Sequence, residues 1–444
     1  MIALIALSGY DRMVKNMRQR TLFITLCTFL LLVREAHADR QLLGTAALST
    51  GFSDNILGVP ETDDPTSAQV EADLFFNISP GAQLSIDKRS AFHLLNYQLT
   101  IRAFTRNSEA NSISNQFTHQ SNFFRTPVTT VNLNSGIATG VINTIDRTGP
   151  FLQDQVTELP TAGGASFFNG FANAGITHQM NIDWSSAGSG GFRFFRRFGQ
   201  ANPRWNFIFP GQVSIQKNFR RHNIGASLNA AYSASTRNNP GQTDALAGGP
   251  RAFWTWDVSE GWSSFVSLGS VIVLAAPEFD AGFALPTGRY TLSYTKDQAF
   301  GSMTYSYGAN ANVFTGDLQA SHRVTGRLGL PVPWVDNVAV TAAAGYRRGR
   351  FLNLDLQELT GRTEQFTASL SSAYQFNPSW AVSGRIQLNR QLREDALTGA
   401  EFGIARRTVN VFFTGTWPNT IRLIPASQGN ERVDEQNDAA QIER

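Results

Sequence analysis

Residues 366–388 read FTASLSSAYQFNPSWAVSGRIQL, and this stretch decides the fold class. Each half alternates apolar with small polar side chains, and Asn377-Pro378-Ser379 separates the halves. Successive side chains of a β-strand point to opposite faces, so each half predicts a strand with one apolar and one polar face. The Pro-containing break predicts a turn, and together the three parts predict a β-hairpin. The apolar positions are Phe366, Ala368, Leu370, Tyr374, Phe376, Trp380, Val382, Gly384, Ile386 and Leu388.

The same alternation recurs throughout residues 39–417. Further apolar faces are Leu95/Tyr97/Leu99/Ile101, Ile224/Ala226/Leu228/Ala230/Tyr232 and Met303/Tyr305/Tyr307/Ala309. No window after residue 38 reaches the roughly 18 consecutive apolar residues that a membrane-spanning helix needs. The mature chain is therefore predicted to be all-β. A soluble sandwich or barrel would show the same alternation.

Two features favour a barrel that crosses a membrane. Apolar faces end near the turns in aromatic residues, as they do in the girdles at membrane interfaces. These residues are Trp262, Phe300, Trp334, Phe376, Trp380 and Trp417. The connections also alternate between short and long, which is typical of outer-membrane barrels. Short turns are predicted at 87–89, 125–127, 178–179, 219–221, 259–261, 299–301, 332–334 and 377–379, and long ones at 143–166, 185–204, 237–250 and 275–287.

Eight short turns join sixteen strands, and residues 42–52 and 404–417 add one at each end. We therefore expect a transmembrane antiparallel up-and-down β-barrel of about 18 strands, within a range of about 16–20. Closure is required because backbone groups in hydrocarbon must pair, and a closed sheet has no edge. Ser79-Pro80-Gly81 interrupts the predicted second strand, so Pro80 is expected at a bulge or near the rim.

The first 38 residues have the layout of a cleaved secretory signal peptide. Basic residues precede the apolar run from Thr21 to Val33, and an Ala-x-Ala site ends at Ala38. The only cysteine, Cys27, would leave with this leader. The leader also accounts for the net charge of +3, which leaves 32 basic and 32 acidic residues in 39–444. Domain boundaries are therefore predicted as 1–38 for the leader, 39–417 for the barrel and 418–444 for a polar periplasmic tail expected to be disordered.

The last predicted strand carries the family resemblance. Residues 409–417, VNVFFTGTW, alternate apolar residues and end in an aromatic. They resemble the terminal signal by which outer-membrane barrels are inserted, and the whole mature chain resembles Gram-negative outer-membrane β-barrel porins. Residues 79–86 and 94–99 resemble, more weakly, the barrel porins associated with exopolysaccharide secretion. The resemblance implies a location in the outer membrane. It also implies outer-membrane lipid, the barrel-assembly machinery, periplasmic chaperones and polysaccharide-export proteins as partners.

Candidate chemistry is sparse. The six histidines are scattered without metal-ligand spacing, so neither a metal nor another cofactor is predicted. The balanced charge gives no reason to expect nucleic acid. Residues 188–191, Gly-Ser-Gly-Gly, are predicted to be a loop tip. His119-Gln120-Ser121-Asn122 resembles the His-x-Ser-Asn motif of outer-membrane phospholipases, but no Gly follows Asn122. We expect no enzyme and no catalytic residue, with these side chains being ordinary polar residues of a strand.

The polar strand faces carry the functional expectation. If Leu318, Ala320, Val324 and Leu328 face lipid, their alternates face the lumen. The predicted pore-lining residues are Arg102, Arg323, Arg327, Arg385, Gln387, Glu71 and Asp73. Arg323 and Arg327 lie four residues apart on one strand and could form a ladder for anionic solutes or sugar acids. The alternative is that they pair with lumen carboxylates or simply hydrate the wall.

Three functions follow as hypotheses. The first is a porin that passes hydrophilic solutes through a polar lumen, with the long loop 143–166 as the candidate constriction. The second is an outer-membrane conduit for a secreted polysaccharide, since amide and hydroxyl groups suit sliding sugars. The third is a structural or adhesive barrel, or a phospholipase, with no useful pore.

Overall fold

The computed structural model describes residues 39–55, 71–141, 166–198, 205–235, 244–275, 282–311, 318–335, 337–353, 358–377, 379–394, 401–416 and 421–422. The chain divides into two compact units. The larger comprises Gln41–Ser85 and Ser90–Ile421, and the smaller comprises Met1–Arg40, Ile86–Arg89 and Arg422–Arg444. The leader 1–38 and nearly all of the tail 418–444 lie outside the described residues, so both assignments stay predictions.

Eighteen long strands form the barrel. They are β1 (Asp39–Ser53), β2 (Asp73–Lys88), β3 (Ala91–Phe104), β4 (Ser112–Thr126), β5 (Thr129–Val141), β6 (Ser166–Gln179), β7 (Trp184–Arg197), β8 (Trp205–Asn218), β9 (His222–Ser235), β10 (Ala245–Ser259), β11 (Trp262–Ala275), β12 (Gly282–Lys296), β13 (Ala299–Ala311), β14 (Leu318–Pro331), β15 (Val338–Asn353), β16 (Glu358–Asn377), β17 (Trp380–Glu394) and β18 (Glu401–Thr416). A 3-10 turn, η1 (Ser108–Ala110), precedes β4, and a two-residue strand, β19 (Ile421–Arg422), follows β18.

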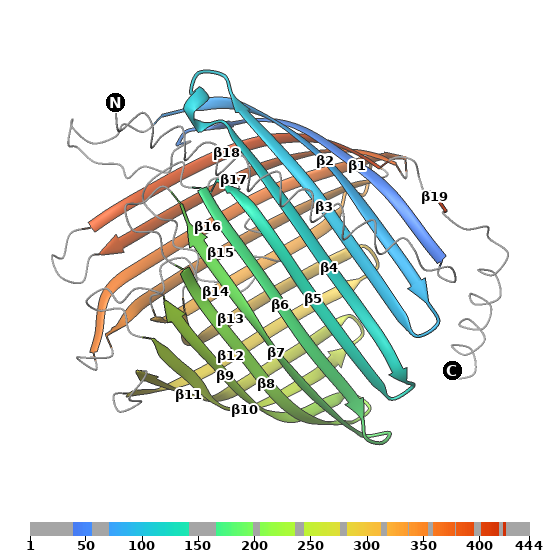
Figure 1. The fold of residues 1–444 in the computed structure, drawn as a ribbon, viewed down its shortest axis with the longest axis vertical. Coiled ribbons are helices and arrows are strands. Elements are labelled where there is room, and N and C mark those ends of the chain that lie inside the picture. Colours follow the sequence, from blue (N-terminus) through green and yellow to red (C-terminus); the bar gives the residue numbers. More distant parts are fainter. Residues whose placement is uncertain are drawn as a thin grey trace, which may run out of the picture. The chain divides into compact units, whose positions relative to one another are not determined.

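Each strand pairs antiparallel with the next, and the sheet closes where β18 meets β1 (Figure 1). The closing ladder runs from Thr45↔Thr416 to Ser53↔Thr408. Closure leaves no free edge, which satisfies the backbone groups of a sheet that lies in an apolar medium. The predicted closed antiparallel barrel of about 18 strands is therefore confirmed. Among the described residues, no helix has the length and apolarity needed to cross a membrane.

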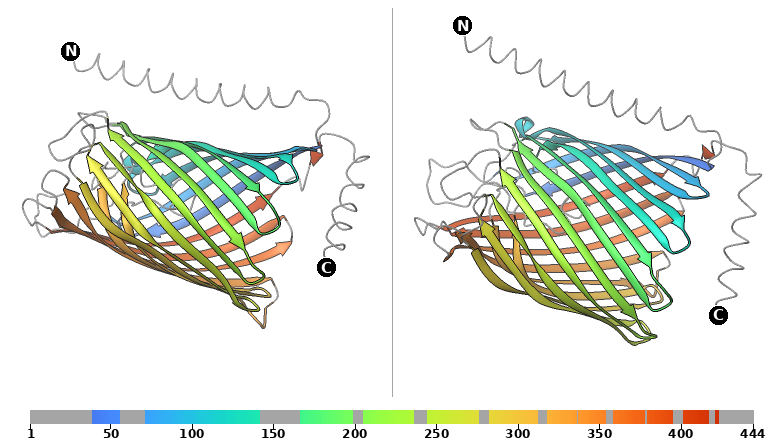
Figure 2. Two further views of the ribbon diagram at one scale, coloured as in Figure 1. Left: turned by 90° about the horizontal axis from the view of Figure 1, so that it is seen from below. Right: turned by 60° about the horizontal axis from the view of Figure 1, so that its bottom comes forward.

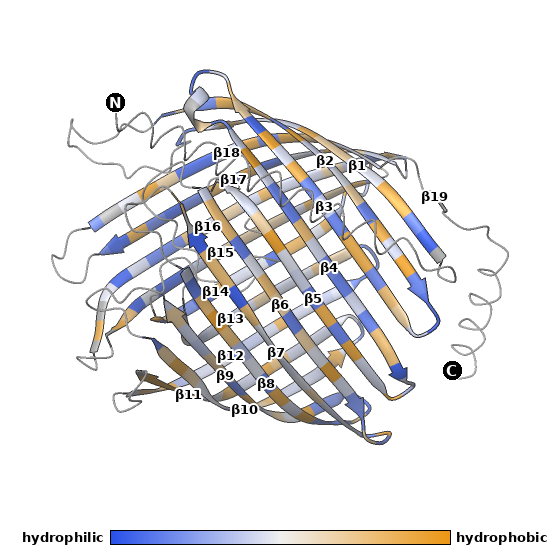
Figure 3. Ribbon diagram, viewed as in Figure 1, coloured by the Kyte–Doolittle hydropathy of each residue, from blue (hydrophilic) through white to orange (hydrophobic). Residues whose placement is uncertain are grey.

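Hydrophilic and hydrophobic residues alternate along the strands of the barrel (Figure 3), and successive side chains of a strand point to opposite faces. On one face large apolar residues are exposed, among them Leu48, Leu228, Ile386 and Val411. We call this the outer face. The opposite face, which carries mostly Ser, Thr, Asn, Gln and Arg, is called the inner face. Neighbouring strands keep these faces in register because their pairing is almost free of shifts.

The short turns confirm the hairpin pattern to within a few residues. Two residues separate β4 from β5 and four separate β6 from β7, and these turns follow one another along one rim (Figures 1 and 2). Two turns are displaced from their predicted positions. The β6–β7 turn follows Gln179, and the β12–β13 turn precedes Ala299. At that second turn Asp297 has a positive φ of 54°, a conformation that Asp tolerates better than most residues.

Three of the four long connections are shorter than predicted. Residues 185–204 were expected to be a loop, but β7 occupies most of them. The expected loops 237–250 and 275–287 likewise give way to β10 from Ala245 and β12 from Gly282. Gly- and Pro-rich composition was misleading here, because a closed ladder supplies hydrogen bonds to stretches that lack strand propensity. The fourth connection, 143–166, lies outside the described residues except for Ser166.

The run from Gly188 to Gly191 corrects the prediction of a loop tip, because it lies inside β7. Its glycines let neighbouring strands approach. A Cβ on Gly191 would lie 2.3 Å from Asn173 Oδ1 and 2.4 Å from Ala172 O, so no other residue fits without a shift of the backbone. Pro80 is also accommodated, since β2 runs through it without a break.

Of the predicted girdle aromatics, Trp262, Trp334, Phe376 and Trp380 are exposed. The prediction that Phe300 belongs to the aromatic girdle is wrong. It alternates with the exposed Met303 and Tyr305 and so belongs to the inner face. Trp417 lies outside the described residues.

The predicted lipid-facing residues of β14 also differ in their exposure. Val324 and Leu328 are exposed as expected, but Leu318 and Ala320 are only 7% and 6% exposed. These two belong to a buried apolar cluster with Val273 of β11, so the expectation that they face lipid is wrong.

Candidate functional site

Strand β14 exposes polar side chains on its inner face and apolar side chains on its outer face. Arg323 and Arg327 are exposed on the inner face, and Val324 and Leu328 are exposed on the outer face. A strand buried against a filled core would show one exposed face only. Both faces of β14 are therefore accessible, which indicates a hollow interior at this level.

Arg323 and Arg327 come together with a third arginine. Arg323 lies directly opposite Arg347 of β15, and the Arg327 guanidinium sits 4.9 Å from the ring centroid of Phe300. The ring contact is a cation–π arrangement that holds the side chain along the wall. Arg347 Nη2 donates a hydrogen bond to Gln319 Oε1 at 3.0 Å. These residues make a cluster of positive charge on β14 and β15.

Several inner-face arginines have no carboxylate partner. In the described part of the chain, no ion pair within 4.0 Å involves Arg251, Arg289, Arg323, Arg327 or Arg385. Nearby carboxylates point the other way. Glu364 of β16 and Glu394 of β17 alternate with the inner-face residues, and Glu364 instead binds Arg348 and Arg362 on the outer face. The alternative that Arg323 and Arg327 pair with described carboxylates is thereby excluded.

Arg385 and Gln387, both predicted site residues, lie on the inner face of β17. Arg385 is opposite Asn410 of β18 and Gln387 is opposite Thr408. Asn410 Oδ1 is buried and accepts no hydrogen bond. The inner face of β17 therefore carries the N–H donors of Arg385 and the amide of Gln387, which has both donors and an acceptor.

Arg102 belongs to a separate inner-face group near the closing strands. Its Nε donates to Asn77 Oδ1 at 2.8 Å, and Asn77 Nδ2 donates to Ser49 Oγ at 2.8 Å. The guanidinium stacks 4.8 Å from the centroid of Phe75. Arg406 of β18 lies close enough for its charge to act on Arg102, and its Nε donates to Ser53 Oγ at 3.2 Å. The structure thus places the charges of Arg102 and Arg406 within reach of each other, and the Asp54 carboxylate also acts on Arg406.

Asp73 anchors a connection instead of standing free on the wall. Its carboxylate accepts hydrogen bonds from the Thr105 hydroxyl, from Arg106 N at 2.8 Å and from Asn107 N at 2.9 Å. Burial by itself would raise the pKa of Asp73, but these bonds outweigh it and lower the pKa to about 2. About ten strand residues suffice to cross a bilayer. Asp73 is the first of the 16 residues of β2, so it lies beyond the apolar band.

Glu71 is exposed and precedes β2. It is not brought together with the arginines of β14 and β17 by any described contact. Of the seven predicted residues, Arg323 and Arg327 thus form one group, Arg385 and Gln387 a second, and Arg102 a third, while Asp73 serves the β3–β4 connection.

The His-x-Ser-Asn segment forms a hydrogen-bonded cluster on the outer face. Ser121 Oγ lies 2.5 Å from His119 Nε2 and 2.7 Å from His93 Nδ1. The two histidine rings are stacked, with their centroids 5.9 Å apart. Sequence reasoning missed His93, which lies opposite Ser121 across the ladder. The serine is 0% exposed, so a lipid ester has no approach to its oxygen. The cluster is a satisfied polar group in an apolar surface.

Four further inner-face arginines were not predicted from the sequence. Arg251, Arg289, Arg347 and Arg406 lie on the inner face. Arg251 and Arg289 come just after the predicted loops 237–250 and 275–287, and Arg406 lies in the predicted last strand, before the part that alternates clearly. Strand parity, once the turns are placed, would have found them. No group of three or more His, Cys, Asp or Glu among the described residues has the geometry of a metal site.

Comparison with known proteins adds structural neighbours only. No protein-family model and no curated protein matches the sequence. Crystal structures of Pseudomonas aeruginosa OpdQ and Acinetobacter baumannii OccAB3 match with a TM-score of 0.43 each and identities of 9% and 8%. They cover 85% of this chain and 98% and 99% of their own. P. aeruginosa OpdK with vanillate has a TM-score of 0.46 at 8% identity, with coverage of 85% and 99%. At these identities the similarity is one of barrel architecture.

Proposed function

We propose that this protein is an outer-membrane channel that passes small hydrophilic anions. The observation that carries the proposal is a set of five inner-face arginines that form no ion pair with any carboxylate of the described residues: Arg251, Arg289, Arg323, Arg327 and Arg385. A barrel of about 18 strands is wide enough for an aqueous lumen. Fixed positive charges in a narrow polar passage raise the local concentration of anions and lower that of cations.

Location in the outer membrane is part of the proposal. It is supported by the closed 18-strand wall, whose outer face exposes apolar side chains from many strands. A soluble protein rarely exposes contiguous apolar area on this scale. The leader, the terminal insertion signal and the assembly partners remain predictions from the sequence.

Planar-bilayer recording of the purified barrel tests the proposal. We expect ohmic conductance and, across a potassium chloride gradient, a reversal potential whose sign reports chloride preference. The preference should fall in ~1 M salt, where the Debye length is only about 3 Å and fixed charges are screened. Silence in the bilayer would refute the channel, and a preference for potassium would refute the role of the arginines.

The polysaccharide conduit is not favoured by any observation on the described residues, so it stays a prediction. The same recording addresses it, since a neutral oligosaccharide that interrupted the current would support it. The candidate constriction 143–166 also stays a prediction, because that loop lies outside the described residues.

A further inference from the structure

The hydrogen-bonded ladder between β12 and β13 stops part of the way along the strands. Pairing runs from Lys296↔Ala299 to Gly288↔Tyr307. Residues 282–287 of β12 and 308–311 of β13 have no partner across this junction, although each segment remains paired on its other side. We call this parted stretch the seam. The neighbouring ladders, β11–β12 and β13–β14, both continue to the ends of these strands.

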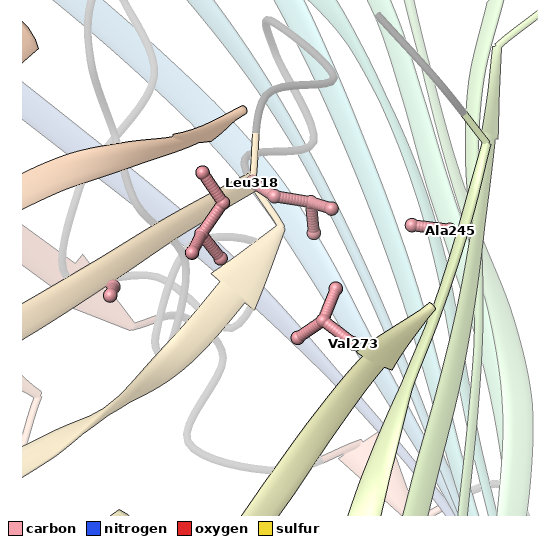
Figure 4. Packing of buried hydrophobic residues seen from close by; sticks show 5 residues of the cluster. Ala245, Val273 and Leu318 are labelled. Atoms are coloured by element: carbon pink, nitrogen blue, oxygen red, sulfur yellow. The ribbon is translucent and has the colours of Figure 1, made fainter. Parts of the chain in front are cut away.

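Side chains from opposite faces of the sheet meet at the seam. Val273 of β11 alternates with the exposed Ile272 and so belongs to the inner face. Leu318 of β14 is in phase with the exposed Val324 and so belongs to the outer face. Both nevertheless lie in one buried cluster, with Ala245 nearby (Figure 4). The tips of β13 and β14 must therefore lie inside the tips of β10 to β12, so that the wall overlaps itself.

An overlapping wall opens at low cost. Separating any other pair of adjacent strands breaks backbone hydrogen bonds, each of which is expensive to leave unmade in an apolar medium. Among the described residues, separating the two sides of the seam breaks contacts between apolar side chains and, at the fork, one side-chain hydrogen bond from Thr287 Oγ1 to Tyr307 O at 3.0 Å. The vacated surface can be covered by another apolar molecule. The packing residues of the seam are Ala245, Val273, Leu318, Ala320 and Leu352, with Ala247, Phe283, Leu285 and Ala309 at the margin.

The seam begins at the depth of the outer leaflet if the short turns face the periplasm, as they do in outer-membrane barrels. Nine paired residues separate its fork from the β12–β13 turn. At about 3.3 Å per residue and a tilt of ~45°, they rise roughly 20 Å, against an apolar band of about 25 Å. An opening here would join the lumen to the upper part of the bilayer.

A positive charge lies at the inner side of the fork. Arg289 follows Thr287 by two residues on the same face, and its guanidinium lies 5.9 Å from the Phe265 centroid. Its Nε donates to Thr291 Oγ1 at 3.4 Å. The side chain is exposed and forms no ion pair with another described residue. An apolar slot beside a free guanidinium matches a molecule with one acyl chain and an anionic head.

We infer that the seam is a lateral route by which a single-chain anionic amphiphile, such as a fatty acid, passes between the lumen and the outer leaflet. The acyl chain replaces the contacts between Leu318 and Val273, and the head group binds Arg289. This inference requires the barrel to lie in a membrane but does not depend on the passage of small anions.

A disulfide at the fork tests the route. A Cβ on Gly308 would lie 3.6 Å from Thr287 Cβ, within the range of disulfides. The mature chain has no other cysteine if the leader that contains Cys27 is removed. The variant Thr287→Cys/Gly308→Cys should therefore lock the seam when oxidised. Ser293→Cys/Ser302→Cys is the matched control, because these residues are opposite each other in the intact ladder of the same strands.

The readout is photolabelling by a diazirine derivative of dodecanoate in liposomes, with labelled peptides identified by mass spectrometry. We expect label on peptides from 282–287 and 308–311 in the native chain, in the oxidised control and in the reduced seam variant. Oxidation of the seam variant should abolish it. Arg289→Gln should weaken labelling by about tenfold, as expected for the loss of a charge-assisted bond. Leu318→Ala, which loosens the packing without a disulfide, should increase it.

The route would be overturned if peptides 282–287 and 308–311 were still labelled in the oxidised seam variant, with the disulfide verified by mass spectrometry. It would also be overturned if all outer-face peptides of the native chain were labelled equally. Dodecanol derivatives that label as well as dodecanoate would refute the role of Arg289. Conductance is recorded on the same preparations. A silent barrel that labels at the seam would refute the proposed channel alone, and a conducting barrel without seam labelling would refute the lateral route alone.

Discussion

Arg323 of β14 and Arg347 of β15 face each other across the ladder, and both belong to the inner face of the wall. Like charges directly opposite one another destabilise a strand pair. Gln319 Oε1 accepts a hydrogen bond from Arg347 at 3.0 Å, but no carboxylate of the described residues lies within ion-pair distance of Arg323. An anion in the lumen would lower this repulsion, which is the effect that the proposed anion passage requires at this point.

Neutralising β14 should reduce anion preference. In Arg323→Gln/Arg327→Gln, an anion about 5 Å from either site loses roughly 0.8 kcal/mol per charge in water, which corresponds to about fourfold in permeability ratio. Reversal potentials in a salt gradient measure the change. Arg348→Gln is the control, since Arg348 is on the outer face beside Glu364. A permeability ratio that moves equally in both variants would contradict the assignment of β14 to the lumen.

Asp73 should make the β3–β4 connection sensitive to acid. Its folded-state pKa of about 2 lies below its ordinary value of 3.8, so the stabilisation is complete above about pH 4 and is lost as the pH falls toward 2. Hydrogen-exchange protection of the Arg106 and Asn107 amides, corrected for intrinsic rates, should drop over this range. Asp73→Asn should remove that protection at all pH values.

Glu71→Gln is the matched control for Asp73, because Glu71 is exposed and only two residues away. It should leave protection at Arg106 and Asn107 unchanged. If the two variants behaved alike, the anchoring role of Asp73 would be wrong.

Gly191 should not tolerate a side chain. Its Cβ would meet a backbone carbonyl oxygen, Ala172 O, at 2.4 Å, so Gly191→Ala should destabilise the barrel by about 1–3 kcal/mol. Gly384→Ala provides the comparison, since nothing lies within 4 Å of a Cβ there. The temperature at which the folded band disappears in heat-modifiable electrophoresis measures both. Equal temperatures would show that β6 and β7 relax freely.

Ser121→Ala should affect stability and leave transport unchanged. The substitution removes the hydroxyl that lies within hydrogen-bond distance of His119 Nε2 and His93 Nδ1, and the loss of these two bonds costs about 1–3 kcal/mol. Ser135→Ala is the control, because Ser135 lies opposite His119 on the same face. Unfolding in urea and single-channel conductance are the two readouts. An esterase activity that depended on Ser121 would contradict the occluded geometry.

Turn residues and alternation were enough to predict the strand number and the closed antiparallel architecture. The hairpin around Pro378 and the terminal strand ending at Thr416 show why: a membrane wall needs one apolar face, and period-two alternation leaves that requirement in the sequence. The same parity rule placed Arg323, Arg327 and Arg385 on the face opposite the exposed apolar residues.

Amino-acid composition gave wrong predictions where Gly- and Pro-rich segments lie inside strands of the closed barrel. The glycines of 188–191 and the composition of 237–250 suggested loops, but Gly188–Gly191 and Ala245–Pro250 lie in strands because their neighbours supply the hydrogen bonds. His93 was missed because its partnership with Ser121 spans 28 residues of sequence and depends on register.

The sequence by itself determined the wall: how many times the chain crosses, and which side of each strand is apolar. Only the tertiary structure decided where the wall is incomplete. Leu318 and Ala320 have the lipid-facing parity, but the early end of the β12–β13 ladder buries them against Val273. Alternation fixes the direction of a side chain relative to its own strand. Whether that direction leads to lipid, water or another strand depends on how far each ladder continues, which is a property of pairs of strands and is not written in either one alone.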